Sequence, residues 1–103
     1  GKDVVIVDEL SKVVCYPNPA RKGVINIINL PTNVQDFSVE IFTLTSKLVR
    51  SYSTDDTEFT ADGYRKVKWD CKNDAGEDVA PGVYLVLVKN ASKKKVMKVA
   101  VIR

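Results

Sequence analysis

The chain contains no histidine, and its 103 residues include only two cysteines, one tryptophan and one methionine. The absence of histidine excludes Ser-His and Cys-His nucleophilic pairs and removes the commonest zinc ligand. Two cysteines alone do not complete a structural zinc site. The sequence therefore predicts a protein that is not an enzyme and that uses no metal and no cofactor.

Long apolar runs and a strong charge imbalance are also missing. No run approaches the roughly 20 apolar residues of a membrane-spanning helix, and the N-terminus lacks the basic and apolar regions of a secretory signal. The formal net charge is only +3, with sixteen basic and thirteen acidic residues. We therefore expect no membrane insertion and no nucleic-acid partner, and a chain that is either cytosolic or a piece of a longer exported protein.

What the chain does contain is a series of short β-branched or alternating runs, separated by clusters of Asp, Ser, Pro and Gly. Nowhere do apolar residues recur at helical spacing for three turns. The expected strands are residues 4–7, 13–16, 24–28, 37–43, 48–52, 66–70, 83–88 and 96–102, with 37–43 and 48–52 paired as a hairpin. Because residues 83–88 are apolar on both faces, we expect a central strand that is covered on both sides.

Seven to eight short strands with turn signals between them predict an all-β fold, an immunoglobulin-like antiparallel β-sandwich. A small closed barrel is the alternative. Residues 13–103 would form this domain, and residues 1–12 would be a linker or an extra N-terminal strand. Trp69 is expected in the core, where such sandwiches commonly bury one tryptophan, and stacking on a sugar is the alternative role.

The stretch CYPNPARKG, residues 15–23, combines two prolines with a later glycine. Pro17 and Pro19 lack amide donors and fix their φ angles, so we expect a kink at a sheet edge. Gly23 is expected to take a positive φ where the next strand begins. Gly82 is expected to allow a close approach of the backbone before the strand that carries Tyr84.

The two cysteines permit a disulfide between Cys15 and Cys71, provided that their Cα atoms lie within about 7 Å. Closing so long a loop would stabilise the domain by roughly 4 kcal/mol in the chain-entropy model. The alternative is a pair of reduced thiols that pack as small apolar residues.

Two acidic segments suggest calcium binding or a pair of catalytic carboxylates, but neither has the residue spacing that such a site requires. Residues 70–78, DCKNDAGED, supply many oxygen atoms, yet their spacing departs from the calcium-binding pattern and the twelfth position is Pro81 rather than glutamate. Asp55 and Asp56 are adjacent, so their side chains would point apart in a strand. We expect solvated turns in both places.

Four segments, YPNPARKGVINIINLP, VEIFTLTSKLVR, VKWDCKNDAGEDVAPGVYLVLV and the terminal KKKVMKVAVIR, occur in this order over residues 13–103. Together they resemble the immunoglobulin-like domain of flagellar hook capping proteins and the C-terminal sorting domains of proteins exported by the type IX secretion system. The chain departs from that pattern at two turns. Cys71 follows the Trp-Asp pair where glycine is usual, and Thr45 and Ser46 occupy a turn that commonly contains glycine.

The resemblance implies a non-enzymatic C-terminal module of an exported bacterial protein. The type IX export machinery would recognise the folded module, and an outer-membrane protease would then usually remove it and attach the preceding cargo to the cell surface. The route implied is through the periplasm to the cell surface or the extracellular space. The implied sorting and recognition motifs are Pro17, Pro19, Gly23, Gly82, Tyr84, Lys93, Lys94, Lys95 and Lys98.

The last fifteen residues, 89–103, hold six basic side chains and no acidic one. These lysines are interpreted either as guards against edge-to-edge aggregation or as a basic strand offered to an export receptor, and the two roles are compatible. Nucleic-acid binding is the weakest interpretation because no aromatic platform interleaves the charges.

Two other classes of function stay open. A carbohydrate- or protein-binding accessory module would present two or three exposed aromatics on one face, and Tyr16, Tyr52 and Tyr64 are the candidates. A structural spacer or assembly domain, as in the hook cap, is the other.

Overall fold

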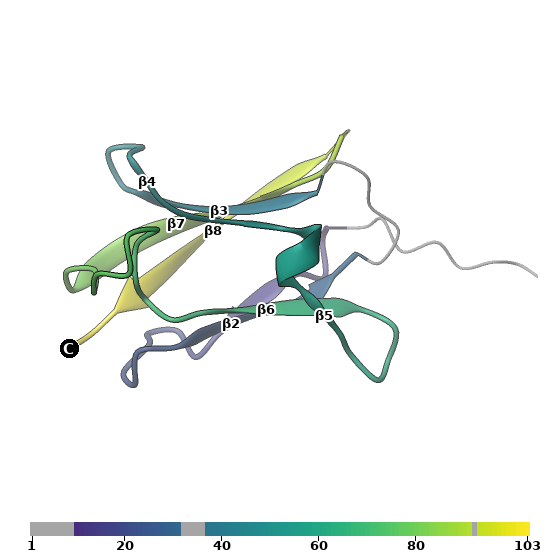
Figure 1. The fold of residues 1–103 in the computed structure, drawn as a ribbon, viewed down its shortest axis with the longest axis horizontal. Coiled ribbons are helices and arrows are strands. Elements are labelled where there is room, and N and C mark those ends of the chain that lie inside the picture. Colours follow the sequence, from purple (N-terminus) through teal and green to yellow (C-terminus); the bar gives the residue numbers. More distant parts are fainter. Residues whose placement is uncertain (1–9, 32–36, 92) are drawn as a thin grey trace, which may run out of the picture.

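The computed structural model describes residues 10–31, 37–91 and 93–103, whose eight strands form two four-stranded sheets packed face to face (Figure 1). All neighbouring strands are antiparallel. In order across the first sheet lie β1 (Val14–Tyr16), β2 (Ile25–Leu30), β6 (Arg65–Trp69) and β5 (Glu58–Phe59). In order across the second lie β4 (Leu48–Ser53), β3 (Ser38–Thr43), β7 (Gly82–Lys89) and β8 (Lys94–Val101). Two separate sheets confirm the predicted sandwich and contradict the closed barrel.

The strands form where the apolar and polar residues alternate. On β3, Val39 and Ile41 are buried between the sheets while Glu40 faces outward, as the two-residue period of a strand requires. The predicted hairpin is confirmed, with Val39 opposite Tyr52 and a register shift beside Phe42. Seven of the predicted runs lie on β1, β2, β3, β4, β6, β7 and β8, and the run at residues 4–7 lies outside the described residues.

Trp69 lies at the centre of the core. Its side chain is fully buried, with 0% exposure, and its indole Nε1 donates to the Lys72 carbonyl oxygen at 2.9 Å. The ring packs edge-on against Tyr84, with 5.5 Å between the ring centroids. The predicted core position is therefore confirmed, and no ring face is free for a sugar.

Two features of the sheets differ from the predictions. The expectation that residues 83–88 are covered on both faces is wrong, because Val83 is 42% exposed and Leu85 and Leu87 are only partly buried. In a two-layer sandwich each sheet has one inner face, and β7 keeps apolar residues on its outer face as well. The short strand β5 was not predicted, since two residues carry no readable period. A single 3₁₀ turn, Thr54–Asp56, leads into β5, and it leaves Asp55 and Asp56 exposed as expected.

Candidate recognition site at the terminal strand

The C-terminal strand β8 forms one edge of the second sheet. It pairs with β7 over its whole length, from Gly82 opposite Val101 to Lys89 opposite Lys94. The strand that carries Gly82 and Tyr84 therefore lies beside the basic terminal strand. Two of the three motif regions that the sequence suggested are direct neighbours.

The third region, the Pro-Asn-Pro loop of residues 16–20, lies along the opposite edge of β8. Asn18 uses both ends of its amide: Nδ2 donates to the Lys98 carbonyl oxygen at 3.0 Å, and Oδ1 accepts from the Ala100 N–H at 3.0 Å. Ala20 continues this pairing, because its N–H donates to the Ala100 carbonyl at 2.7 Å and its carbonyl accepts from the Ile102 N–H at 2.9 Å. The chain thus leaves the first sheet after Tyr16 and joins the edge of the second.

The sequence explains why a side chain takes over this pairing. Pro17 and Pro19 have no N–H to donate, so the backbone of the loop cannot form a regular ladder. Asn18, between them, offers a donor and an acceptor in one side chain and replaces the missing strand groups. Both X-Pro bonds of the loop are cis. Gly23 then turns the chain into β2 with φ of +76°, as predicted.

The four lysines proposed as one motif divide between two environments. Lys95 faces the space between the sheets, where Nζ donates to the carbonyl oxygens of Ser11 at 2.9 Å and Val13 at 2.8 Å. Lys94 and Lys98 lie on the outer face and are exposed, because neighbouring residues of a strand face opposite sides. Lys93 is also exposed, in the turn between β7 and β8, and its N–H donates to Asn90 Oδ1. Lys95 therefore joins the edges of the two sheets.

Gly82 and Tyr84 have structural roles at the start of β7. The expected close approach at Gly82 is wrong, since a Cβ placed there would meet nothing within 4 Å. The reason for glycine is instead its φ of +155°, which other residues rarely adopt. Tyr84 is buried, which raises the pKa of its hydroxyl above the ordinary value, and the hydroxyl donates to the Ala80 carbonyl at 2.6 Å.

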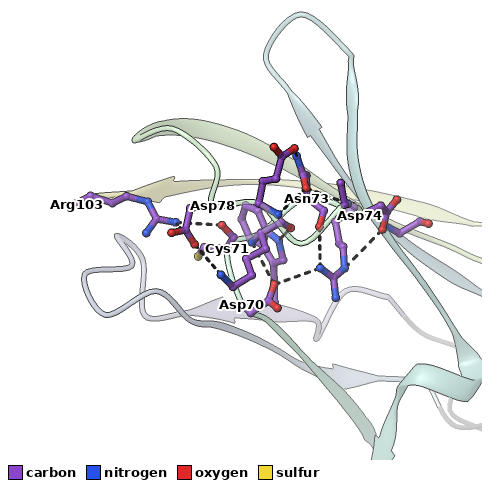
Figure 2. Close-up of polar contacts among 12 residues, drawn as sticks. Asp70, Cys71, Asn73, Asp74, Asp78 and Arg103 are labelled. Atoms are coloured by element: carbon purple, nitrogen blue, oxygen red, sulfur yellow. Dashed lines mark hydrogen bonds and ion pairs between the residues drawn. The ribbon is translucent and has the colours of Figure 1, made fainter.

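The acidic loop of residues 70–78 covers part of the opposite edge of the second sheet (Figure 2). The N–H of Asp74 donates to the Val49 carbonyl on β4 at 2.9 Å. Arg50, also on β4, pairs with Asp70 at 3.4 Å and with Asp74 at 3.6 Å. The oxygen atoms that suggested calcium thus face cationic side chains. Within the described ranges, no three His, Cys, Asp or Glu residues gather where a metal could bind.

The C-terminal residue is anchored to the same loop. Arg103 donates from Nε to the Val79 carbonyl at 3.0 Å and from Nη2 to the Cys71 carbonyl at 3.1 Å, and Nη2 lies 3.8 Å from Asp78. Asp78 also accepts a hydrogen bond from Lys72, and this bond and the two nearby cations lower the pKa of its carboxyl group. Neither Arg103 nor Asn18 was predicted as a site residue from the sequence. The signal available for Asn18 was its position between two residues without N–H groups.

Both cysteines are free thiols, so the disulfide considered between Cys15 and Cys71 is not formed in this structure. Cys15 Sγ lies 3.8 Å from Met97 Sδ on β8, and burial raises the pKa of the Cys15 thiol to about 11. Cys71 is fully buried, and burial raises its thiol pKa as well. The thiols pack as apolar groups, which was the alternative to a bridge.

The aromatic side chains that could have formed a sugar platform do not gather on one face. Tyr52 is buried on β4 in the second sheet, whereas Tyr16 is exposed on β1 in the first. Tyr64 lies in the turn before β6. The three residues therefore form no shared stacking surface.

The order of the strands defines the class of the protein. A first sheet β1-β2-β6-β5 facing a second sheet β4-β3-β7-β8 is the A-B-E-D and C′-C-F-G arrangement of immunoglobulin-like sandwiches. The bond from Tyr84 back to Ala80 resembles the tyrosine corner of that class. Residues 14–103 match the family described as the secretion system C-terminal sorting domain, and the chain belongs to that family.

Two solved structures from the type IX secretion system of Porphyromonas gingivalis are similar to this chain. PorZ, described as an essential bacterial surface component of that system, is 31% identical with a TM-score of 0.67, over 93% of this chain and 12% of PorZ. Dimeric latent PorU is 26% identical with a TM-score of 0.60, over 87% of this chain and 9% of PorU. The chain thus spans about a tenth of either structure. No curated protein matches it.

Family membership makes this domain a sorting module of the type IX secretion system, within a non-catalytic family, and it implies export through that machinery. No helix in the described part of the chain is long and apolar enough to cross a membrane. The two departures from the family pattern keep the glycine-like backbone, since φ is +57° at Cys71 and +68° at Ser46. Cys71 and Ser46 therefore both take a positive φ, which glycine adopts more readily than other residues.

Proposed function

We propose that this domain directs the export and surface attachment of whatever protein precedes Lys2, and that the export machinery recognises the folded edge of β8. One observation carries the proposal: the three motif regions, residues 17–19, 82–84 and 93–98, converge on β8 and the segments along its two sides. A linear signal would not require the Pro-Asn-Pro loop to bind the last strand.

The place where the chain enters the domain also lies beside β8. Leu10 and Ser11 lie beside Lys93, Lys94 and Lys95, around one shared hollow, and Lys95 bonds the Ser11 carbonyl. Cargo attached before these residues would emerge at the basic end of β8. In this proposal residues 1–12 form the connection, whether as linker or as extra strand, and the processing protease cuts on that side of the domain.

The proposal also includes the export route of the domain and its lack of catalytic activity. The domain passes the periplasm with its cargo, and the cargo ends at the cell surface or in the medium. The domain itself carries out no catalysis. The lack of a shared aromatic surface among Tyr16, Tyr52 and Tyr64 gives a carbohydrate-binding role no support.

The test is a fusion of a signal peptide, a fluorescent reporter and residues 1–103, expressed in a host that has the type IX system. We expect the reporter on the cell surface or in the medium, and loss of that export when residues 94–103 are deleted. A matched control replaces the exposed Glu58 on β5, on the other sheet, by glutamine and should be exported normally. A reporter that stays in the periplasm with the intact domain would overturn the proposal.

A spacer or assembly domain predicts a different result. In that case the fusion with the intact domain and the fusion without residues 94–103 would reach the surface equally well or equally poorly. Surface labelling with a membrane-impermeant reagent, followed by cell fractionation, separates the two outcomes.

A further inference from the structure

The backbone groups on the free edge of β8 are only partly used. The bonds from Asn18 and Ala20 reach the Lys98 carbonyl and both backbone groups of Ala100. Backbone direction alternates along a strand, so the N–H and C=O groups of residues 94 and 96 also point away from β7. No described residue bonds the N–H or the C=O of Val96. The edge is therefore closed from the Lys98 carbonyl to residue 102, and among the described residues it is open from residue 94 to the Lys98 N–H.

A hollow runs beside the open part of this edge. Its apolar lining residues are Val13, just before β1, Val14 and Cys15 on β1, and Met97 on β8. The polar side chains of Asn18, Lys95 and Lys98 complete its lining. A strand added to β8 would direct every second side chain into this hollow, because side chains alternate between the two faces of a sheet.

The outer face beside the same edge is apolar with basic ends. Val96 is 56% exposed and shares a second hollow with Phe42, Leu85 and Leu87. Lys94 and Lys98 stand on either side of Val96, and neither has a carboxylate partner in the described part of the chain. The nearest acidic residue on this face, Glu40, is paired with Lys89 at 3.0 Å.

These charges determine what kind of strand the edge accepts. A second copy of β8, added antiparallel about Val96, would place Lys98 of each copy opposite Lys94 of the other, and like charges directly opposite are unfavourable. A strand with carboxylates at these two positions would form two favourable cross-strand pairs instead. A lipid surface is disfavoured, because Leu85 and Leu87 are partly buried in the sheet and two lysines supply only about 2 kcal/mol of attraction.

We propose that residues 94–98 are a β-augmentation site for an extended segment of a partner protein. The segment has carboxylates opposite Lys94 and Lys98, a β-branched residue opposite Val96, and an apolar residue opposite Met97. Identifying that partner as a component of the export machinery rests on the function proposed above. The edge pairing itself does not depend on it.

The first test uses a synthetic peptide, Thr-Glu-Ile-Val-Ile-Glu-Thr, and the whole 103-residue chain labelled with ¹⁵N. We expect the amide of Val96 to shift and its hydrogen exchange to slow when the peptide is added, because a new hydrogen bond protects that N–H. The control peptide has lysine in place of both glutamates and should bind at least about tenfold more weakly. Protection that is absent from Val96, or equal for both peptides, overturns the proposal.

The second test removes the free donor alone. Val96→Pro deletes an N–H that takes no part in the ladder with β7, so the fold should survive, as a thermal melt will show. Binding of the acidic peptide should fall by about tenfold or more. Val96→Thr keeps the N–H and should bind like the unaltered chain. If Val96→Pro folds and binds normally, the segment docks by some other contact and the proposal fails.

A charge-reversal variant tests the proposed pairing independently, in case the proline variant does not fold. The double variant Lys94→Glu/Lys98→Glu should prefer the lysine peptide to the glutamate peptide by about tenfold. An unchanged preference contradicts the proposed pairing. So does binding of the unaltered chain to vesicles of anionic phospholipid with no binding of the acidic peptide, which would show a lipid surface as the true partner.

The export assay then distinguishes this proposal from the function on which it partly rests. If the unaltered fusion is exported and Val96→Pro is retained while Val96→Thr is exported, both proposals are supported. If all three are exported, the sorting function stands and edge pairing to the machinery is wrong. If none is exported, the sorting proposal fails, and the peptide experiments still decide whether the edge accepts a strand.

Discussion

The two halves of β8 use the same alternation of side chains for opposite purposes. In the C-terminal half, Val99 and Val101 are 1% and 2% exposed, and the edge is closed by Asn18 and Ala20. In the N-terminal half, Val96 is exposed, and no residue that the structure describes bonds its outward N–H and C=O groups. The C-terminal half anchors β8 in the sandwich, and the N-terminal half leaves the edge of β8 free to pair with a partner strand.

This difference shows how the edge of a sheet can be rigid and still be free to bind a partner strand. An exposed strand that frayed would lose entropy when a partner bound it, and binding would weaken accordingly. Here β7 pairs with all of β8, while the closed half and Arg103 hold its end. The open half is therefore ordered before any partner arrives, and its lysines discourage pairing with itself.

The largest expected effect concerns the two thiols. Cys15 lies beside the open half, and Cys71, whose backbone carbonyl accepts a hydrogen bond from Arg103, lies beyond the closed half. At pH 8, Cys15 should react with iodoacetamide about a hundredfold more slowly than an unburied thiol, because its pKa rises from 9.0 to about 11 and the thiolate is the reactive form. Its rate should climb with pH until about pH 11. Cys71 should be slower still, because it is fully buried.

Peptide mapping by mass spectrometry after timed alkylation measures both rates in one sample. Unfolding in urea should make the two cysteines react equally. Rapid labelling of Cys71 in the folded protein would contradict the closed packing of that end.

The next effect contrasts the valines of the two halves. Val101→Ala removes two buried methyl groups and should lower the free energy of unfolding by about 2 kcal/mol. Val96→Ala alters an exposed position and should change it by less than about 0.5 kcal/mol. Urea denaturation of both variants measures the difference, and equal losses would show that the halves are packed alike.

A smaller effect tests how the edge is closed. Asn18→Ala removes the bonds to Lys98 and Ala100 and should cost about 1 kcal/mol of unfolding free energy. Asn18→Asp keeps the acceptor for the Ala100 N–H but places a carboxylate near the Lys98 carbonyl, so it should not restore stability. Hydrogen exchange at Ala100 should accelerate in the alanine variant, and an unchanged rate would mean that Asn18 does not protect that edge.

The smallest effect distinguishes the inward lysine from the outward one. Lys95→Met removes the bonds of Nζ to Ser11 and Val13 and should destabilise the domain by about 0.5 kcal/mol. Lys94→Met should leave the free energy of unfolding unchanged, because its side chain is exposed and forms no ion pair with any residue that the structure describes. Thermal melts of the matched pair measure this. The reverse ranking would contradict the assignment of Lys95 to the joint between the sheets.

Much of the fold could be predicted because local residue patterns determine where most of the strands form. The β-branched runs, the hairpin of β3 and β4 and the burial of Trp69 follow from alternation and residue size. The strand β5 and the open outer face of β7 could not be predicted, since a two-residue strand has no period and an all-apolar run does not tell which face is covered.

The candidate site was predicted as a set of motifs rather than as an arrangement. Pro17 and Pro19 indicated a kink, but nothing local showed that Asn18 would bond Ala100, more than eighty residues away in sequence. Nor could the run of lysines reveal that Lys95 alone reaches the first sheet. Such contacts depend on the pairing of distant segments, which the order of residues along one strand does not record.

The sequence by itself determined the class of protein: an all-β sandwich without histidine chemistry, and a family membership carried by four segments in order. Only the tertiary structure decided how those segments act together. Packing two sheets face to face brings β1 beside β8, so that the Pro-Asn-Pro loop closes one half of the terminal edge and leaves the other open. The physical reason is that hydrogen bonds between strand edges are made across space, by groups that every residue carries whatever its side chain.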